Sequence, residues 1–197
     1  VPEPRYDTIS FLTDYGTTDE FVGVVKSVIR DLAPHVGVVD LTHGIPPFDV
    51  RAGSLALARC ISYVPSGVVL AVVDPGVGTQ RRALAVQVGT RWLVAPDNGL
   101  LTGVMNTLGV AYAYEITNRS LMRPGKITAT FHGRDIYGPV AAHLAAGITP
   151  SDVGPPIEEL AKLPIARAKQ EKKALAGAVV HVDRYGNLMT NISSELV

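Results

Sequence analysis

The segment from Val72 to Arg82 constrains the fold most, because a strongly apolar run stops there at an acid. Asp74 follows the apolar residues, Pro75 and two glycines make a turn, and two arginines close the segment. Pro75 fixes one φ angle and the glycines widen the choice of backbone conformations, so the arginines can fold back toward the carboxylate. We expect a buried strand that ends at Asp74, beside a cation that keeps it ionised. Taken alone, the segment fits a structural ion pair and a functional carboxylate equally well.

The rest of the chain alternates predicted strands and helices. The predicted strands cover 8–12, 36–41, 68–73, 83–88 and 92–95, and helices are expected after the first, second and last of them. Parallel strands joined by helical crossovers are the simplest architecture for this order. Such sheets bind ligands outside the carboxyl ends of their strands, and the residues we expect there are Asp14, Phe48, Asp74 and Asp97.

Two further candidates have a functional and a structural interpretation. His132 lies just before Gly133 in a predicted loop over 130–135, which precedes a helix that ends at Ala146. There it can act on a substrate or merely hydrogen-bond within the loop. Asp19 lies five residues after Asp14 and is also the expected N-cap of a helix over 21–33. The sequence does not choose between these roles.

Composition and charge narrow the class of partner. Eighteen basic and eighteen acidic residues cancel, and no basic run is interleaved with aromatic residues, so we expect neither nucleic acid nor a membrane surface as partner. No apolar stretch approaches the roughly 20 residues that span a bilayer, and Val1–Pro4 lacks the parts of a signal peptide. Cys60 is expected to be a small buried thiol, which fits a reducing compartment. We therefore expect a cytoplasmic protein with a small-molecule partner.

The composition changes toward the end of the chain. Proline, glycine and aspartate become frequent, and a basic, polar stretch follows at 167–173. We expect an α/β domain over 1–166, followed over 167–197 by a linker and the start of a smaller β domain. Its predicted strands cover 178–182 and 188–192. Two strands do not make a stable domain, so we expect the sequence to be part of a longer chain.

Five motifs follow one another in a characteristic order: Thr13–Asp19, Asp74–Gly78 with Arg81, Ala95–Gly99, Phe131–Asp135 and Asp183–Asn191. In this order they resemble the S-adenosyl-L-methionine (SAM) hydroxide adenosyltransferases. These adenosine-forming SAM hydrolases are related to fluorinase and chlorinase, and the likeness covers residues 6–197. The resemblance implies a Rossmann-like N-terminal α/β domain with a mostly parallel sheet and a smaller β C-terminal domain. It also implies a homotrimer whose active sites lie between the N-terminal domain of one subunit and the C-terminal domain of its neighbour.

The resemblance assigns a role to each candidate residue. The residues expected to bind SAM are Asp14 at the ribose hydroxyls, Phe48 on the nucleoside, Asp19 and Asp183 at the methionine ammonium, and Asn187 at the adenine edge. Asp183 and Asn187 would act across a subunit interface. Asp74, Arg81 and His132 would surround the nucleophilic water, and Arg82 would replace Arg81 if the register is shifted by one residue.

The chemistry of SAM explains why three residues around a water molecule would suffice for the reaction. Its C5′ is bonded to a sulfonium, so displacement expels a neutral thioether and only the nucleophile needs activation. Water has a pKa near 15.7, and the sequence shows no tetrahedral His/Cys cluster that would hold a metal to lower it. We therefore expect SN2 attack of an activated water at C5′, without metal or cofactor, to give adenosine and L-methionine. Either Asp74 or His132 would accept the proton while Arg81 balances the charge.

Three alternatives stay open. A halogenase of the same superfamily would use chloride, whereas Gly133 argues against fluoride because the fluorinase carries a hydroxyl at that position. A metal-dependent hydrolase would place four side chains on one ion: Asp14, Asp74, His132 and Asp135. A nucleotide-binding module would use 74–78 as a phosphate loop, although the spacing is neither that of a P-loop nor GxGxxG.

Overall fold

The computed structural model describes residues 5–166, 168–172, 174–193 and 196. The chain divides into two compact units between Leu163 and Pro164. Val1–Pro4, where we expect no signal peptide, and Arg167 and Lys173, the ends of the expected linker stretch, lie outside the described residues.

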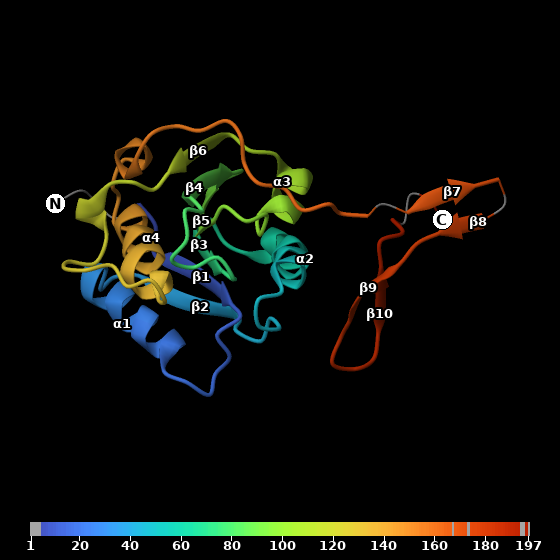
Figure 1. The fold of residues 1–197 in the computed structure, drawn as a ribbon, viewed down its shortest axis with the longest axis horizontal. Helices are drawn as coiled ribbons and strands as arrows, with labels where there is room; N and C mark the ends of the chain where they lie inside the picture. The colour runs from blue at the N-terminus through green and yellow to red at the C-terminus, as the bar shows by residue number, and fades with distance from the viewer. Residues whose placement is uncertain (1–4, 167, 173, 194–195, 197) are drawn as a thin grey trace. The chain divides into compact units, whose positions relative to one another are not determined.

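The first unit is built on a six-stranded sheet with the strand order β2-β1-β3-β5-β4-β6 (Figure 1). The strands are β1 (Thr8–Thr13), β2 (Gly37–Thr42), β3 (Gly67–Val72), β4 (Ala83–Val88), β5 (Arg91–Pro96) and β6 (Tyr112–Glu115). β1 pairs in parallel with β2 and β3, and β3 pairs in parallel with β5. The predicted α/β class with a mostly parallel sheet is therefore confirmed.

The expectation of parallel strands is wrong for β4, which runs antiparallel to both β5 and β6. Only residues 89–90 separate β4 from β5, and so short a turn joins antiparallel strands alone. β4 therefore starts at the edge where β3 and β5 end, which returns Arg81 and Arg82 to that edge. The sequence analysis also misses β6, because this short strand has no continuous apolar run.

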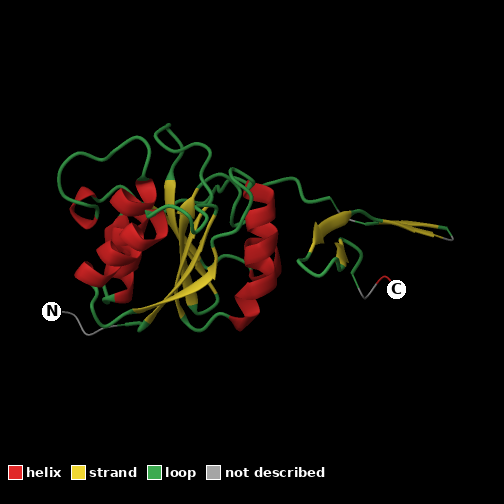
Figure 2. Cartoon of the chain, turned by 90° about the horizontal axis from the view of Figure 1, so that it is seen from below, coloured by secondary structure: helices red, strands yellow, loops and turns green. Residues whose placement is uncertain are grey.

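Helices cover both faces of the sheet, so the first unit has three layers (Figure 2). They are α1 (Phe21–Leu32), α2 (Val50–Cys60), α3 (Thr102–Leu108) and α4 (Gly138–Ala145), with 3-10 turns at η1 (Ile61–Tyr63), η2 (Arg119–Leu121) and η4 (Pro150–Val153). α1 packs with α4, and α2 packs with α3. Neighbouring residues of β1 enter different cores, Phe11 one and Leu12 the other, as expected for a strand buried on both faces. Cys60 is half-buried rather than buried.

Two predicted helix starts are wrong. α1 begins after Glu20, so Asp19 is not its N-cap. The segment after His132 is not a loop, because the π-helical turn η3 (Gly133–Tyr137) leads directly into α4. A π turn is fixed by tertiary packing rather than by apolar periodicity, and it often marks a functional site.

The second unit contains two short antiparallel pairs. β9 (Val179–Val182) pairs with β10 (Leu188–Thr190), which confirms the two strands predicted there. β7 (Lys169–Glu171) pairs with β8 (Ala174–Ala176) where a linker is expected. The reason for this error is that β7 is exposed along its whole length, so its sequence needs no apolar face and looks like polar coil.

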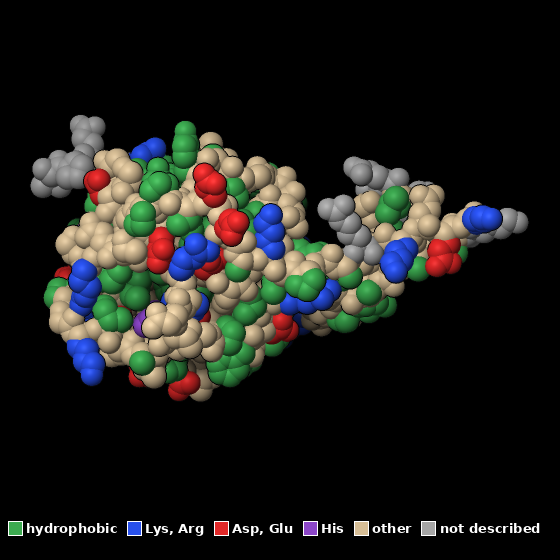
Figure 3. Space-filling model, turned by 45° about the horizontal axis from the view of Figure 1, so that its top comes forward, with side chains coloured by type: hydrophobic (Ala, Val, Ile, Leu, Met, Phe, Trp, Pro, Cys, Tyr) green, Lys and Arg blue, Asp and Glu red, His purple; other side chains and the backbone are tan. Residues whose placement is uncertain are grey.

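Two further properties of the described residues concern membrane spans and surface charge. No helix among them has the length and apolar content that a membrane span requires. On the visible face of the first unit, acidic and basic side chains are interspersed (Figure 3), in keeping with the eighteen residues of each sign.

Candidate active site

A cavity of about 220 Å³ lies at the carboxyl ends of β1 and β3. β1 pairs with β2 on one side and with β3 on the other, so the strand order changes direction at this point. Open α/β sheets bind their ligands at such a switch point. Eight of the residues that line the cavity are Asp14, Tyr15, Phe21, Phe48, Asp74, Thr130, His132 and Gly133. The fold thus gathers four of the predicted site residues from four separate segments.

Arg81 connects Asp74 to His132. Its Nε donates to Asp74 Oδ1 at 2.9 Å and its Nη2 donates to Asp74 Oδ2. The same Nη2 lies 2.7 Å from His132 Nδ1. The Asp74 and Arg81 side chains are only 6% and 11% exposed, so most of this ion pair is screened from water.

The contact with Arg81 fixes the protonation of His132. A guanidinium has five donors and no acceptor, so His132 Nδ1 must accept the hydrogen bond and the ring proton must lie on Nε2. Burial, and then the positive charge of Arg81, lower the pKa of His132 below its usual 6.5. His132 is therefore a neutral imidazole at pH 7, with its Nε2–H as the remaining donor.

Arg82 has different partners. Its Nε and Nη2 donate to Asp97 Oδ2 at 2.8 and 2.6 Å, and Nη2 also donates to the Glu159 carbonyl at 2.7 Å. Asp97 Oδ1 accepts the Ala161 N–H at 2.8 Å. Arg82 therefore ties residues 159–161 to the sheet, and of the two arginines it is Arg81 that contacts Asp74 and His132.

Asp14 and Phe48 meet at the rim of the cavity. The Phe48 N–H donates to Asp14 Oδ2 at 2.8 Å. Phe48 is the only described non-glycine residue with positive φ, at 67°, and its ring is 70% exposed. Burial raises the pKa of Asp14, and the negative charge of Asp74 raises it further. The hydrogen bond from the Phe48 N–H lowers this pKa but does not cancel the rise. One carboxylate thus lines the cavity and holds an exposed aromatic ring beside it.

Four predicted site residues do not line this cavity: Arg81, which contacts Asp74 and His132 on its wall, and Asp19, Asp183 and Asn187. Asp19 is exposed in the loop before α1. Asp183 and Asn187 belong to the second unit, where Asn187 donates to Asp183 from its backbone at 2.8 Å and from its side chain at 2.7 Å. These hydrogen bonds from Asn187 lower the pKa of Asp183 and shape the turn between β9 and β10.

Tyr137 and Tyr15, two residues around the site, are not among the predicted site residues, and Asp135, named only as a candidate metal ligand, has another role. The fully buried Tyr137 places its hydroxyl 3.4 Å from Asp74 Oδ2 and its ring 5.4 Å from the Arg81 guanidinium carbon. Asp135 is also fully buried, and although burial alone would raise its pKa, hydrogen bonds from Arg134 and Thr128 lower it to about 2. These bonds anchor η3 and so fix His132 at its start.

Tyr15 is the second residue without a predicted role, and it lines the cavity directly. The available signal was an aromatic residue immediately after Asp14, at the end of a buried strand. In the sequence it belongs to a loop rich in turn-forming residues, which hides its role.

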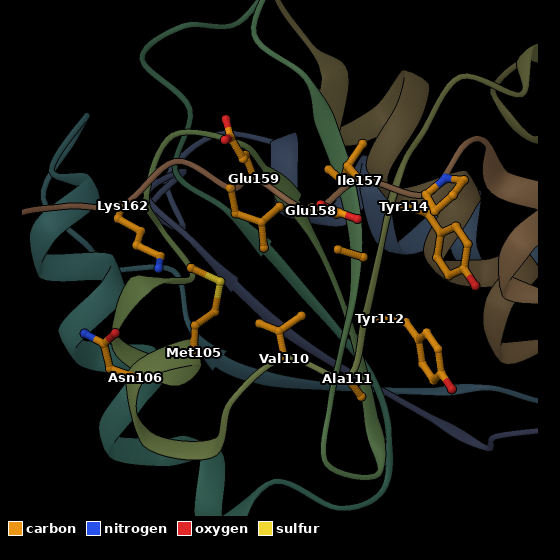
Figure 4. Close-up of a pocket in the computed structure, with 13 residues that line it drawn as sticks. Met105, Asn106, Val110, Ala111, Tyr112, Tyr114, Ile157, Glu158, Glu159 and Lys162 are labelled. Atoms are coloured by element: carbon orange, nitrogen blue, oxygen red, sulfur yellow. The ribbon is translucent and has the colours of Figure 1, made fainter.

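A larger hollow of about 770 Å³ lies between the end of α3, β6 and residues 156–162 (Figure 4). Figure 4 shows Tyr112 and Tyr114 on one side of the hollow and Met105, near Asn106 and Lys162, on the other side. None of the predicted site residues lines it. Size therefore does not identify the site, whereas the smaller cavity combines carboxylates, an imidazole and an aromatic ring.

The geometry disfavours two of the alternatives. Among the residues that the structure describes, no three His, Cys, Asp or Glu side chains are grouped so that they could hold a metal ion. Asp135 is committed to Thr128 and Arg134 instead. In the proposed phosphate loop, the N–H groups of Val77 and Thr79 donate to carbonyls within the turn, so they are not free to bind a phosphate.

Comparison with known proteins gives one family. A family model for the SAM hydroxide adenosyltransferase N-terminal domain matches residues 9–154. A protein of Salinispora tropica named (R)-S-adenosyl-L-methionine hydrolase is 46% identical, over 96% of this chain and 73% of the relative. A fluorinase of an Actinoplanes species is 30% identical, over 93% of this chain and 71% of the relative. A crystal structure of an uncharacterized conserved protein from Thermotoga maritima superposes with a TM-score of 0.91 at 42% identity, over 95% of this chain and 72% of that one. The chain therefore belongs to the SAM hydroxide adenosyltransferase family.

Proposed function

We propose that this protein is an enzyme that hydrolyses SAM to adenosine and L-methionine. Its similarity to relatives named hydrolase, at 42 to 46% identity, is greater than its 30% identity to a fluorinase. The observation that carries the proposal is the hydrogen-bonded set of Asp74, Arg81 and His132 beside a cavity that Asp14 also lines.

The proposed reaction is a single displacement. The oxygen of a water molecule attacks C5′ of SAM, and the C5′–S bond breaks with its electron pair going to sulfur. Methionine leaves as a neutral thioether, so no acid has to protonate it. The protein supplies a position in line with the breaking bond and an acceptor for the proton that the water loses.

The hydrogen bonds of the site favour Asp74 as that acceptor. The lone pair of His132 Nδ1 faces Arg81 at 2.7 Å, so His132 acts as a donor to the water oxygen through Nε2–H. An ionised carboxylate accepts several hydrogen bonds on two oxygens, which leaves Asp74 a free lone pair beside the two that Arg81 engages. Arg81 keeps the net charge of the set near zero.

The substrate contacts follow the family resemblance. Asp14 binds the ribose hydroxyls and Phe48 packs on the nucleoside, which their place on the cavity wall supports. Asp19 and Asp183 bind the methionine ammonium, and Asn187 reads the adenine edge. We further propose a cytoplasmic homotrimer, without cofactor, in which the second unit of a neighbouring subunit completes each site.

The names of the relatives suggest a stereochemical preference. "L" already describes the α-carbon of methionine, so the prefix (R) in those names refers to the sulfonium sulfur. We propose that this chain also hydrolyses the (R) epimer faster than the (S) epimer.

Incubation with each purified SAM epimer, followed by chromatography of the products, tests the function. We expect adenosine and methionine in equal amounts, faster from the (R) epimer and unchanged by EDTA. Saturating chloride should yield no 5′-chloro-5′-deoxyadenosine. Formation of that product would support the halogenase alternative, loss of activity in EDTA would support a metal enzyme, and absence of adenosine would refute the proposal.

A further inference from the structure

We propose that the hydroxyl of Tyr15 is a second hydrogen-bond donor to the attacking oxygen as that oxygen loses its proton to Asp74, and that Gly133 is a glycine to leave room for it. Loss of the proton gives the oxygen a third lone pair, so one lone pair attacks C5′ while the other two accept from His132 and Tyr15. The inference rests on the proposed hydrolysis of SAM. It assigns a catalytic contact to a residue outside the set of Asp74, Arg81 and His132.

The position of Tyr15 is fixed on three sides. Its ring packs against Phe21 and Phe131 with centroid separations of 5.9 Å in both cases. Its backbone N–H donates to Thr13 Oγ1 at 3.1 Å. An aromatic ring held in this way brings its polar tip to one place without losing further side-chain entropy on binding.

Tyr15 lines the same cavity as Asp14, Asp74 and His132. Asp14 and Asp74 are both near enough to act on its ionisation, and Arg81 is as well. If Asp14 binds the ribose hydroxyls, the C5′ atom lies one bond from that ribose ring, toward Asp74. The Tyr15 hydroxyl lies close to Gly133, the residue after His132, so this donor is on the side of the cavity where the water attacks.

Tyr15 can serve only as a donor there. Burial, and then the negative charges of Asp14 and Asp74, raise its pKa well above the usual 10. The phenol stays protonated at physiological pH and cannot be the base. Among the described residues no acceptor takes its proton in a hydrogen bond, whereas the Tyr137 hydroxyl reaches Asp74. Because Tyr15 is half-buried and lines the cavity, its hydroxyl is available to donate to what fills the cavity.

Gly133 makes the space for this hydroxyl. A Cβ added at Gly133 would lie 2.2 Å from the Tyr15 hydroxyl oxygen, but 3.2 Å from the ring carbon that bears it. The hydroxyl itself is thus the main obstacle to a side chain at this position. Because Gly133 follows His132, any displacement of the Tyr15 phenol would occur beside His132, next to the proposed position of the nucleophilic water.

A double-mutant cycle tests the inference in the full chain. Tyr15→Phe should lower kcat at least about tenfold, as the loss of one aligned donor predicts, with KM for SAM within about twofold. Gly133→Ala should also lower kcat, because its Cβ displaces the phenol. The double variant should be no worse than Tyr15→Phe, because removal of the hydroxyl removes the clash. Tyr63→Phe, at an 87% exposed tyrosine, is the matched control and should keep wild-type kcat.

Two outcomes would overturn the inference. One is wild-type kcat in Tyr15→Phe, and the other is a double variant whose losses multiply, since that means the two residues act independently. Thermal unfolding of each variant separates a catalytic from a structural effect, because Tyr15→Phe should leave Tm nearly unchanged. An inactive wild type would refute the proposed function itself, whereas an active wild type with an equally active Tyr15→Phe would refute only this inference.

Discussion

Two neighbouring arginines form two ion pairs with different consequences. Arg81 binds Asp74 at the end of β3, and Arg82 binds Asp97 at the end of β5. Successive side chains of an extended segment point to opposite sides, so the two guanidinium groups diverge. Both carboxylate side chains are 6% exposed. Charge and the burial of the carboxylate therefore do not tell the two pairs apart.

The difference lies in what completes each pair. Backbone groups complete the pair of Arg82 and Asp97, namely the Glu159 carbonyl and the Ala161 N–H. The pair of Arg81 and Asp74 meets His132 instead, and it borders a cavity. Groups of the protein itself complete the pair of Arg82 and Asp97. The pair of Arg81 and Asp74 has hydrogen-bonding capacity left for a ligand. That remaining capacity, rather than the ion pair, is the reason to place the proposed active site at Asp74.

The carboxylates and the histidine give the largest contrast. Asp74→Ala and His132→Ala should each lower kcat by at least about 10²-fold with little change in KM, because they remove the groups that position and deprotonate water. Asp97→Ala should keep kcat within about threefold. Steady-state kinetics on the three variants decides, and near-normal turnover in both Asp74→Ala and His132→Ala would contradict the assignment.

Exchange of each arginine for lysine sharpens the comparison. Lysine cannot reproduce the fork that holds Asp74 and His132 together, so Arg81→Lys should lower kcat by about 10- to 100-fold. Arg82→Lys should leave kcat unchanged, since its partners lie outside the cavity. Equal losses in the two variants, measured under the same conditions, would show that the pairs are not functionally distinct.

The pair of Arg82 and Asp97 should matter for the stability of the fold, although it should not matter for kcat. Asp97→Ala leaves the Ala161 N–H and the Arg82 guanidinium without their acceptor, which should lower the free energy of unfolding by about 1 to 3 kcal/mol. Thermal or urea unfolding measures this loss. An unchanged Tm would mean that the Arg82 pair does not hold the 159–161 segment.

The pH dependence of kcat/KM gives the smallest contrast. The active His132 is neutral, and its pKa is lowered by burial and by Arg81. Activity should therefore be full above pH 6.5 and be lost as pH falls through the lower pKa of the folded enzyme. Asp14, whose pKa burial raises, must stay ionised and adds to the loss on the same acidic side.

His143 is the control for that profile. Burial also lowers its pKa, but it lies on α4 away from the cavity, so His143→Gln should leave the acid limb where it is. Loss of activity already between pH 8 and 7 would contradict a neutral His132.

The sequence predicts much of this architecture because the information is local. Apolar runs that end at polar turns locate β1, β3 and β5, and parallel strands bring Asp14, Phe48 and Asp74 to one edge. The motifs around Arg81 and His132 identify the partners before any distance is known.

The rest depends on tertiary contacts that periodicity does not encode. Strand direction is not visible in an apolar run, so the antiparallel return of β4, which delivers Arg81 and Arg82, is missed. The π turn after His132 depends on the buried Asp135, and the space at Gly133 depends on Tyr15. The division of labour between Arg81 and Arg82 likewise appears only when their partners are located.

Hydrolysis of SAM in ¹⁸O-labelled water tests the central claim most directly. If the Asp74, Arg81 and His132 set delivers water to C5′, mass spectrometry should find one ¹⁸O atom at the 5′ position of adenosine and none in methionine. The rate of labelling should fall at least about 10²-fold in Asp74→Ala and remain near that of the wild type in Asp97→Ala. Unlabelled adenosine, or a product halogenated at C5′, would contradict the account.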